Sequence, residues 1–393
     1  MKKHILAIIV VLFTFSAIDS NAKSYVIRGV LDLKGGKFEI PENTTLRFKK
    51  NGMIINGEIV GNKTHVKASK KRLFENVTIS GSWVIKTVYS DWLDFSCDEN
   101  RDNSQNFKNL MAFCDEQIRQ IVYISRGSYW TSTSSQGEAL LIPSNTKVIN
   151  EASIYEIPNS FEHCSLVRIS KAENVSLIGG FYYGDVENHK GTTGEWSHGI
   201  QCEGSRNVVI KDVVCNDFWG DGIDIVEAYD DKRKPTLICY NINVDNATCL
   251  YNRRQGISIE AVFGCEVINC NFSYTGTKKY TRPADGIDIE AWNTYGEKLK
   301  DITIRNCTME GNRGKSISIF ANGPWLKDYE LYRNNILIES CSMNDIFATC
   351  SYGIEYKKCT MESRMHQYVT ELIYTNCVVN GKKVSDRVTN RWE

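Results

Sequence analysis

The sequence has few prolines and no excess of charge of either sign. Its 393 residues include only six prolines, and 47 Lys and Arg balance 47 Asp and Glu. The low proline content excludes collagen-like and proline-rich low-complexity chains. Because proteins bind nucleic acids by neutralising phosphates with Lys and Arg, the balanced charge predicts no nucleic-acid partner. A hydrophobic fraction of 42% is typical of a chain that builds a globular core.

Long apolar runs are absent after the N-terminus. Lys2 and Lys3 precede an apolar run from Ile5 to Phe15, and small residues ending at Ala22 follow it. This order predicts a cleaved signal peptide over residues 1–22 and a secreted or periplasmic protein. No cysteine follows the run as a lipid attachment residue (no lipobox cysteine), and no later stretch approaches the ~18 apolar residues of a membrane span. We therefore expect neither a lipid anchor nor a membrane span.

The cysteines are spaced as a repeat. Cys270, Cys307, Cys341 and Cys377 are separated by 37, 34 and 36 residues, and each follows an Asn or a Ser. Neighbouring strands rarely bring two cysteines into disulfide geometry, so we interpret these residues as buried thiols stacked in one core column. The asparagines before them are interpreted as a ladder of turn residues.

Two strand-like phrases alternate along this repeat. The first reads VVIKDVVC from 208, INVDNATC from 242, CEVINCNF from 265, ITIRNCTM from 302, ILIESCSM from 336 and LIYTNCVV from 372. The second reads HGIQCE at 198, DGIDIV at 221, QGISIE at 255, DGIDIE at 285, KSISIF at 315 and YGIEYK at 352. Apolar residues at every second position are typical of strands and exclude a helical solenoid. The sequence therefore predicts an all-β fold, a parallel β-helix with one coil per repeat.

The pattern is looser before residue 120. Residues 23–100 are predicted to form an N-terminal β-rich segment, and residues 101–393 the parallel β-helix. Helical spacing of Phe107, Leu110 and Cys114 predicts a helix near 103–118. Because the open end of a solenoid must be covered to prevent edge pairing, we expect this helix to cap the coils.

With these phrases, roughly residues 120–380 resemble the right-handed parallel β-helix superfamily of pectinases, bacterial polysaccharidases and phage tailspikes. The resemblance implies a polysaccharide partner. Polygalacturonase-type glycoside hydrolases are a distant match: their NTD, GDD, GHG and RIK motifs correspond here to WSH at 196, WGD at 219, RQG at 254 and DIE at 288. One Asp of GDD is kept as Asp221, whereas the basic residues of RIK become Asp288 and Glu290. These acids would repel an anionic sugar, so a neutral or weakly charged polysaccharide is expected.

The second phrase gathers acids on three successive coils. Its fourth positions form an outward column made of Gln201, Asp224, Ser258, Asp288, Ser318 and Glu355, preceded by Arg168. The acids on the three coils are Asp221, Asp224, Glu260, Asp285, Asp288 and Glu290. Stacked like charges raise one another's pKa, which suits a general acid. We predict a solvent-facing catalytic site of Asp221, Asp224, Asp288, Glu290 and Glu260, although Asp before Gly is also common in turns.

Spacing along the coils favours hydrolysis of a glycosidic bond. Asp224 and Asp288, two coils apart, are expected near ~10 Å, at the upper end for an inverting pair with its water, whereas Glu260 and Glu290 are expected near ~5 Å, which leaves retention open. The favoured assignment has Asp224 or Asp221 as acid and Asp288 or Glu290 as base. Aromatic rings near the acids, including Trp196, suit sugar faces. The predicted substrate-binding residues are His198, Trp219, Arg254, Asp285, Trp292 and Lys315.

Two other functions stay open at this point. Arg253, Arg254 or Lys315 could serve as the base of a polysaccharide lyase, with Ca²⁺ held by Asp221, Asp224 or Asp288. A non-catalytic glycan-binding solenoid is the third hypothesis. No cofactor is expected for a hydrolase.

Overall fold

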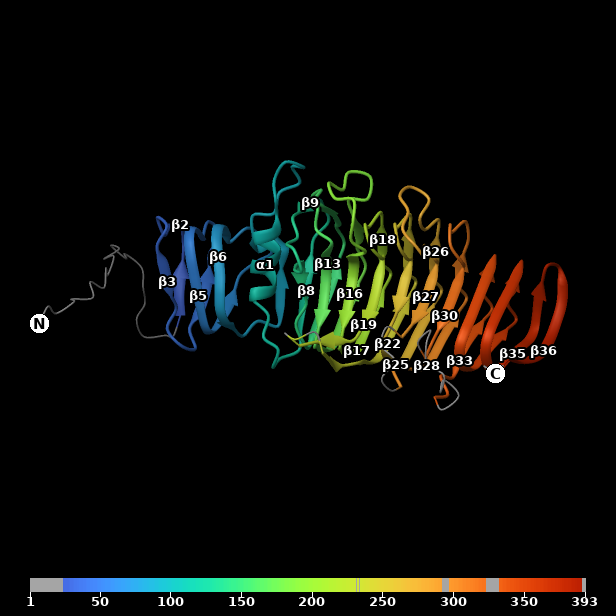
Figure 1. Ribbon diagram of the computed structural model, residues 1–393. Coiled ribbons are helices and arrows are strands. Elements are labelled where there is room, and N and C mark those ends of the chain that lie inside the picture. The colour runs from blue at the N-terminus through green and yellow to red at the C-terminus, as the bar shows by residue number, and fades with distance from the viewer. Residues whose placement is uncertain (1–23, 231, 233, 292–296, 323–331, 391–393) are drawn as a thin grey trace, which may run out of the picture.

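The computed structural model describes residues 24–230, 232, 234–291, 297–322 and 332–390, which form one elongated stack of strands (Figure 1). The predicted signal peptide, 1–22, and Trp292 lie outside the described residues. The predicted all-β class and right-handed parallel β-helix are confirmed. Among the described residues, twenty-eight strands belong to one sheet that is wound into coils, and each coil crosses three faces.

The first face carries the second sequence phrase. Its strands are β10 (Glu138–Leu141), β13 (His163–Ser170), β16 (Trp196–Glu203), β19 (Ile223–Val226), β24 (Ile257–Ile259), β27 (Ile287–Glu290), β30 (Ile317–Phe320) and the first part of β33 (Asp345–Lys357). Ile223 and Ile225 are fully buried, as the alternation of apolar residues predicts.

The second face carries the first phrase. Its strands are β7 (Thr87–Tyr89), β8 (Gln120–Ile124), β11 (Thr146–Asn150), β14 (Glu173–Ile178), β17 (Arg206–Lys211), β22 (Cys239–Asp245), β25 (Val262–Ile268), β28 (Leu299–Arg305), β31 (Ile336–Glu339), the end of β33 and part of β35 (Ser363–Val379). All these pairings are parallel, so each strand continues the ladder of the one before it.

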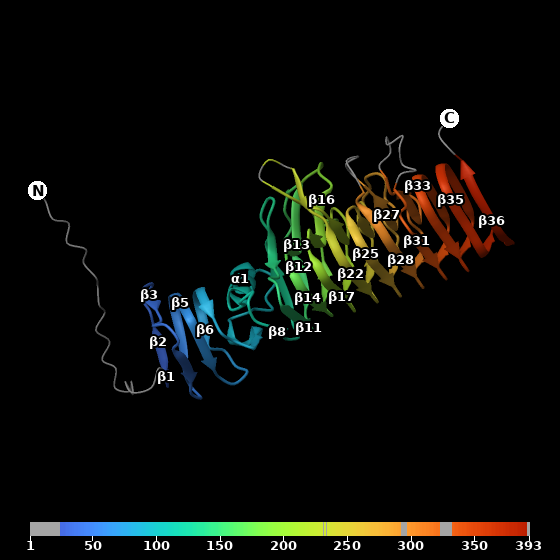
Figure 2. The same cartoon turned by 90° about the horizontal axis from the view of Figure 1, so that it is seen from below.

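The third face consists of short strands. They are β9 (Ser128–Thr131), β12 (Ser153–Glu156), β15 (Phe181–Tyr183), β18 (Val214–Asn216), β23 (Thr248–Leu250), β26 (Asn271–Ser273), β29 (Thr308–Met309), β32 (Ser342–Met343) and β34 (Thr360–Met361). Outside the parallel coils, β20 (Ala228–Tyr229) pairs with β21 (Pro235–Leu237), and β36 (Lys382–Asn390) pairs with β35, both antiparallel. The strands stack along one axis, from the first coils to β36 at the other end (Figures 1 and 2).

Asparagines at left-handed backbone positions make the turn between the second and third faces. Asn269 and Asn306 have φ of 59° and 55°, a conformation that Asn tolerates better than other side chains. The side-chain amide of Asn306 donates to that of Asn269 at 3.3 Å. A second ladder, at the turn into the second face, joins Asn174, Asn207 and Asn241 through amide bonds of 2.9 to 3.1 Å. The predicted turn ladder is confirmed.

The cysteine column is present but has a shorter period near the C-terminus. Cys270, Cys307, Cys341 and Cys377 are all buried, and every cysteine of the chain is a free thiol. Cys359 is also part of the column, because Ser342 pairs with Thr360 and Thr360 pairs with Val378. The spacing of 36 residues between Cys341 and Cys377 is therefore two coils of 18 residues each.

This shorter period corrects the assignment of the last phrase. β33 runs through the first and second faces without a break. Ser318 pairs with Phe347, whereas Glu355 pairs with Leu337 on the second face. The prediction that Glu355 continues the column of Ser318 was wrong, because it assumed that every coil has the length of the earlier ones.

Six strands precede the large sheet and form a sheet of their own. They are β1 (Ser24–Ile27), β2 (Val30–Asp32), β3 (Lys37–Glu39), β4 (Thr45–Phe48), β5 (Met53–Lys67) and β6 (Phe74–Trp83). The short helix η1 (Ser90–Trp92) and helix α1 (Ser104–Ala112) follow β7 and precede β8. The core is continuous across this junction, where the rings of Trp83 and Phe113 lie 5.0 Å apart.

Helix α1 falls within the predicted range of 103–118 but is shorter. It packs against β6 on one side and β10 on the other, so it lies between the N-terminal strands and the coils rather than at an open end (Figure 2). Buried Asn109 accepts from the backbone N–H of Ile79 at 3.0 Å and donates to the carbonyl of Val77 at 2.6 Å. These bonds satisfy part of the edge of β6, while a capping role for the coils stays a prediction.

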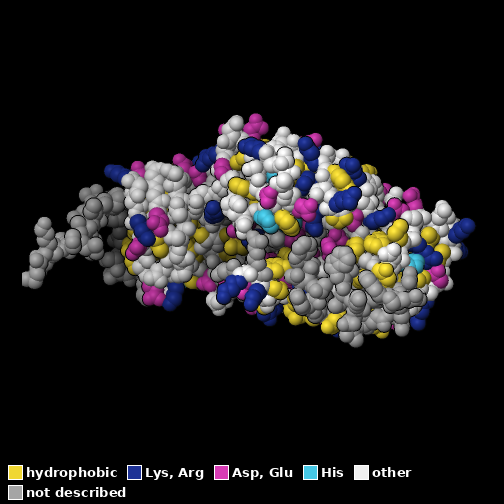
Figure 3. Space-filling model, viewed as in Figure 1, with side chains coloured by type: hydrophobic (Ala, Val, Ile, Leu, Met, Phe, Trp, Pro, Cys, Tyr) yellow, Lys and Arg dark blue, Asp and Glu magenta, His cyan; other side chains and the backbone are white. Residues whose placement is uncertain are grey.

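The surface carries both positively and negatively charged side chains. Basic and acidic side chains are interspersed on the face shown in Figure 3, as a neutral chain requires. In the part of the chain that the structure describes, every helix is too short or too polar to span a bilayer.

Candidate functional site

The pairing of first-face strands brings the predicted acids together. Gln201 pairs with Asp224, Asp224 with Ser258, and Ser258 with Asp288. Asp224 and Asp288 therefore stand two coils apart on one column, as the sequence predicted. The set Asp221, Asp224, Glu260, Asp285, Asp288 and Glu290 is called the acid patch below.

In three copies of the second phrase, the side chain of the first residue accepts a hydrogen bond from the backbone of the next coil. The Asp221 backbone N–H donates to Nδ1 of His198 at 3.2 Å. The Asp285 N–H donates to Oε1 of Gln255 at 2.7 Å, and the Lys315 N–H donates to Oδ1 of Asp285 at 2.5 Å. These repeated bonds give His198, Gln255 and Asp285 a structural role in stacking the coils.

Asp221 departs from this ladder. Its Oδ2 accepts from Nη1 of Arg254 and from Oγ of Ser258, both at 2.9 Å. The residue is fully buried, and its Oδ1 has no hydrogen-bond partner among the described residues. Buried polar atoms are paired in most proteins, so this oxygen is a candidate contact for a ligand.

Asp224 and Asp288 are arranged alike. Gln201 donates to Oδ2 of Asp224 at 3.0 Å, and Gln255 donates to Oδ2 of Asp288 at 2.7 Å. In each carboxyl group the other oxygen has no hydrogen-bond partner in the described part of the chain. His198 adds a ring nitrogen, Nε2, at 3.6 Å from Oδ2 of Asp224. Because Nδ1 of His198 accepts a hydrogen bond, Nε2 is the ring nitrogen that carries a proton toward Asp224.

The burial of these acids corrects one prediction. Asp224 and Asp288 were expected to face solvent, but they are only 3% and 2% exposed. Neighbouring polar side chains lie against the outer side of the first face, including Gln201 on Asp224 and Gln255 on Asp288. Glu260 and Glu290 stay partly exposed.

Burial raises the pKa of most carboxyl groups in the acid patch. The pKa of Asp288 is raised well above its usual value by burial and by the charges of Glu290 and Asp285. Burial likewise raises the pKa of Glu260 strongly, with a contribution from Asp224. The pKa values of Asp224, Asp285 and Glu290 are raised for the same first reason. Desolvation disfavours the charged form, so these carboxyl groups hold their protons to higher pH than exposed acids do.

Arg254 is the cation within the patch. It is 6% exposed and contacts Asp221 and Ser258. Burial alone would lower its pKa, but the charges of Asp221, Glu260 and Asp288 outweigh burial and raise the pKa above the usual value. Arg254 therefore stays protonated and neutralises part of the acid charge.

Trp219 is not available to a sugar. Its ring lies between the ring of His189, with centroids 4.1 Å apart, and the guanidinium of Arg253 at 3.9 Å. Both faces are covered and the residue is buried, so the predicted sugar-stacking role is wrong for this ring. Trp196, by contrast, is 40% exposed and stacks on His163 at 4.3 Å. It stands two residues before His198, at the border of the patch.

A buried ion pair beyond the ends of the first-face strands has no signal in the repeat pattern. Nζ of Lys298 lies 2.6 Å from Oε2 of Glu227, and the Tyr229 hydroxyl donates to Oε1 of Glu227 at 2.7 Å. Glu227 and Tyr229 follow β19, and Lys298 precedes β28 two coils later, where neither repeat phrase fixes a spacing. Lys315, which was predicted to bind substrate, is partly exposed and pairs with Asp345 at 3.8 Å.

The acids considered as calcium ligands have partners within the protein, which are Arg254 on Asp221, Gln201 on Asp224 and Gln255 on Asp288. Asp221, Asp224 and Asp288 were considered as ligands for Ca²⁺, which prefers six to eight oxygen atoms around it. The Arg254 guanidinium already contacts Asp221 and contributes its positive charge at this place. Within the described residues, no group of three or more His, Cys, Asp or Glu is arranged to hold a metal ion.

Comparisons with known proteins show the fold and leave the activity open. No family model matches the chain. It is 27% identical over 246 residues to the uncharacterized protein YclG of Bacillus subtilis (strain 168), a match covering 57% of this chain and 41% of that protein. It is 26% identical over 245 residues to the prophage-derived uncharacterized protein YorA of the same organism, covering 56% and 42%. The chain thus spans about two fifths of the length of these curated relatives.

Among solved structures, the A-module of mannuronan C-5 epimerase AlgE6 of Azotobacter vinelandii is similar. The TM-score is 0.52 at 14% identity, covering 75% of this chain and 83% of that one. At this identity the likeness shows the shared β-helix fold alone, because one fold hosts many activities.

Proposed function

We propose that this protein is an exported carbohydrate-active enzyme that hydrolyses glycosidic bonds of a neutral or weakly charged polysaccharide at the acid patch. The observation that carries the proposal is the pair Asp224 and Asp288. Both are buried on one column with Ser258 between them, and each keeps one carboxyl oxygen without a partner among the described residues. A buried oxygen atom without a hydrogen-bond partner destabilises a fold. A solenoid with a purely structural role would have no need of such atoms, whereas a substrate could bind them.

The separation of the pair supports inversion of configuration. Two coils of about 4.8 Å each place the column positions about 10 Å apart, near the span that an inverting pair needs for its water. Glu260 and Glu290, on adjacent coils, would instead have the closer spacing of a retaining pair.

The surroundings of each acid suggest its role. The charged neighbours of Asp288 that raise its pKa most are Glu290 and Asp285, which favour a protonated carboxyl group and hence a general acid. Burial raises the pKa of Asp224, but His198 and Arg254 act against this rise, so we assign Asp224 the activation of water, with Asp221 held by Arg254 beside it. This proposal reverses the assignment that the sequence favoured.

Elimination with Arg254 as the base fits less well. A base acts in its deprotonated form, whereas the acids around Arg254 raise its pKa and keep it charged. Burial lowers the pKa of Arg253, but its guanidinium lies over the Trp219 ring. The two reactions differ in their products, because hydrolysis releases reducing ends and elimination creates an unsaturated sugar that absorbs ultraviolet light.

The proposal is tested on a panel of neutral and weakly charged polysaccharides, assayed for reducing ends and for ultraviolet absorbance. We expect reducing ends alone. Asp224→Asn and Asp288→Asn should each lose at least ~10²-fold in rate, with unchanged circular dichroism. Glu266→Gln, an exposed acid on the second face, is the matched control and should keep full activity. Full activity in both Asn variants, or an ultraviolet-absorbing product, contradicts the proposal.

A further inference from the structure

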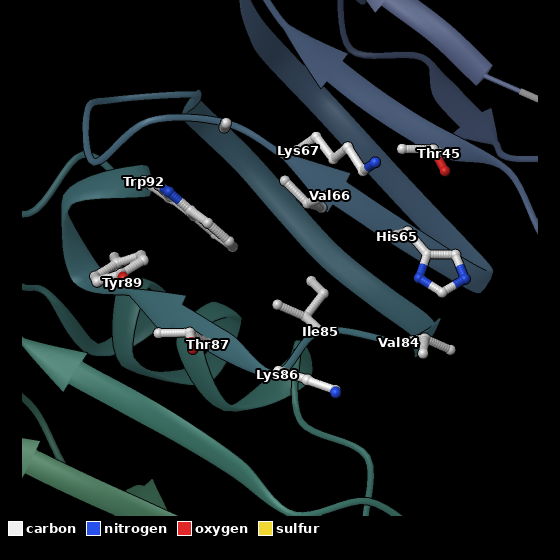
Figure 4. A pocket seen from close by; sticks show the side chains of 11 residues that line it. Thr45, His65, Val66, Lys67, Val84, Ile85, Lys86, Thr87, Tyr89 and Trp92 are labelled. Carbon is white, nitrogen blue, oxygen red and sulfur yellow. The ribbon is translucent and has the colours of Figure 1, made fainter.

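A basic groove lies away from the acid patch, between the N-terminal strands and the first coils. A cavity of about 640 Å³ opens between the end of β5 and the start of β7 and is lined by Lys67, Lys86 and Tyr89. In Figure 4, His65 and Lys67 lie on one side of it and Lys86 on the other, with Ile85 between them.

A second hollow continues the first along the second face. Its volume is about 500 Å³, and it is lined by Lys86, Arg119 and Lys147. The two hollows share Lys86 and Thr87, so they form one groove that runs across successive coils. Thr87 pairs with Ile121, and Ile121 pairs with Lys147, which places Lys86, Arg119 and Lys147 on three neighbouring coils.

The cations of this groove lack acidic partners. Within the described residues, no carboxylate oxygen lies within 4.0 Å of the charged nitrogens of Lys67, Lys86, Arg119 or Lys147. Nearby acids already pair elsewhere: Asp91 with Lys70 at 3.6 Å, and Glu173 with Arg206 at 3.5 Å.

The N-terminal wall of the groove is basic as a whole. Residues 24–83 contain 11 Lys and Arg against five Asp and Glu, a net charge of +6 in a chain that is neutral overall. Positive potential is therefore concentrated at one end of the molecule and focused in a hollow.

We propose that this groove binds an anionic polysaccharide and holds it along the second face. A coil rise of about 4.8 Å is close to the length of one sugar residue, so cations on successive coils can meet successive acidic sugars. Asn145, Asn174 and Asn207 line the second hollow. Each amide already donates one hydrogen bond within the protein, and its second N–H can donate to a sugar hydroxyl.

Nucleic acid fits the groove less well. Single strands bind by stacking bases on exposed aromatic faces. Here the rings of Tyr89 and Tyr123 stack on each other at 5.5 Å, and Trp92 meets Tyr89 edge-on. The faces of these rings are thus covered by other groups of the protein. The ring edges and the asparagine amides remain to contact the hydroxyl groups of a sugar.

The test compares polymers that share one backbone. Binding of the full chain to carboxymethyl dextran, dextran sulfate, uncharged dextran and duplex DNA is measured by affinity electrophoresis at low and high salt. We expect retention by at least one of the two anionic dextrans, weakened by salt, and no retention by dextran. Comparing carboxymethyl dextran with dextran sulfate shows whether the groove prefers carboxylate or sulfate groups.

Matched variants locate the binding. Lys67→Gln with Lys86→Gln should weaken binding to the preferred anionic dextran about tenfold and reduce its dependence on salt. Lys382→Gln with Lys383→Gln makes the same change of charge at the opposite end and should bind as the unaltered chain does. Equal losses in the two pairs, no binding to either anionic dextran, or tighter binding to DNA would overturn the proposal. We expect both pairs of variants to hydrolyse polysaccharide at the rate of the unaltered chain. A loss of binding without a loss of hydrolysis distinguishes the groove from the acid patch.

Discussion

Nη1 of Arg254 donates to Oδ2 of Asp221 at 2.9 Å, across 33 positions of the chain. Both residues are buried, at 6% and 0% exposure. Removing one partner of a buried ion pair leaves an uncompensated charge, which destabilises more than the loss of the pair as a whole. This pair therefore connects the stability of two neighbouring coils with the charge of the acid patch.

Replacing Arg254 by Met should lower the free energy of unfolding by about 3–5 kcal/mol, because the charge of Asp221 stays buried without its partner. Asp221→Asn in the same chain should restore part of the loss. Urea denaturation of the single and double variants measures both effects. Arg206→Met removes an exposed pair with Glu173 and should change stability by no more than about 1 kcal/mol. A double variant less stable than Arg254→Met alone would contradict this explanation.

The two tryptophans near the patch should behave differently. Trp196→Ala should raise the KM for the polysaccharide and leave the fold intact, because the ring is exposed and lies at the border of the patch. Trp219→Ala should instead lower the free energy of unfolding by about 3 kcal/mol or more, because the ring is buried between His189 and Arg253. Steady-state kinetics and thermal unfolding of both variants distinguish the roles. Unchanged KM in Trp196→Ala would remove it from the substrate site.

Stability should fall as pH rises through the range in which Glu156 ionises. Burial and the charge of Asp185 raise the pKa of Glu156 to about 7, from a usual value of 4.5. The folded state holds the proton of Glu156 more tightly than the unfolded chain does. The stability that this proton adds to the fold is therefore complete below pH 4.5 and is lost progressively up to about pH 7. The shift corresponds to roughly 3 kcal/mol.

The measurement compares unfolding free energies at pH 5 and pH 8 in the unaltered chain and in Glu156→Gln. The variant, which cannot ionise at this position, should lose less stability between the two values. Glu173→Gln changes an exposed glutamate and should follow the unaltered chain. Identical pH dependence in Glu156→Gln and the unaltered chain would show that Glu156 is not the group concerned.

The asparagine ladder should show a backbone effect separate from its hydrogen bonds. Asn207 has φ of 54°, and its amide donates to Asn174 at 3.1 Å and accepts from Asn241 at 2.9 Å. Asn207→Gly and Asn207→Ala both lose these bonds, but only Ala has a Cβ that is strained at positive φ. The Ala variant should be the less stable by about 1 kcal/mol in urea denaturation. Equal stability would mean that the turn relaxes to another conformation.

The repeat made much of the first face predictable. Copies of the DGI phrase carry the same alternation of buried and outward residues, so the pairing of Asp224, Ser258 and Asp288 follows from aligning the copies. That reasoning failed at Glu355, where the coil shortens to 18 residues. The repeat length was taken from the longer coils, and Cys359 was not among the aligned cysteines. Without Cys359, the interval between Cys341 and Cys377 looks like one long coil.

The amino-acid sequence by itself determined the coils, because alternating apolar residues and left-handed asparagines act locally and repeat in every copy. Tertiary structure alone decided that Asp224 and Asp288 are buried, that Arg254 binds Asp221, and that Trp219 is covered while Trp196 is exposed. The reason is physical: burial and ion pairing depend on long side chains from loops and neighbouring coils, whose directions no periodicity in the chain specifies.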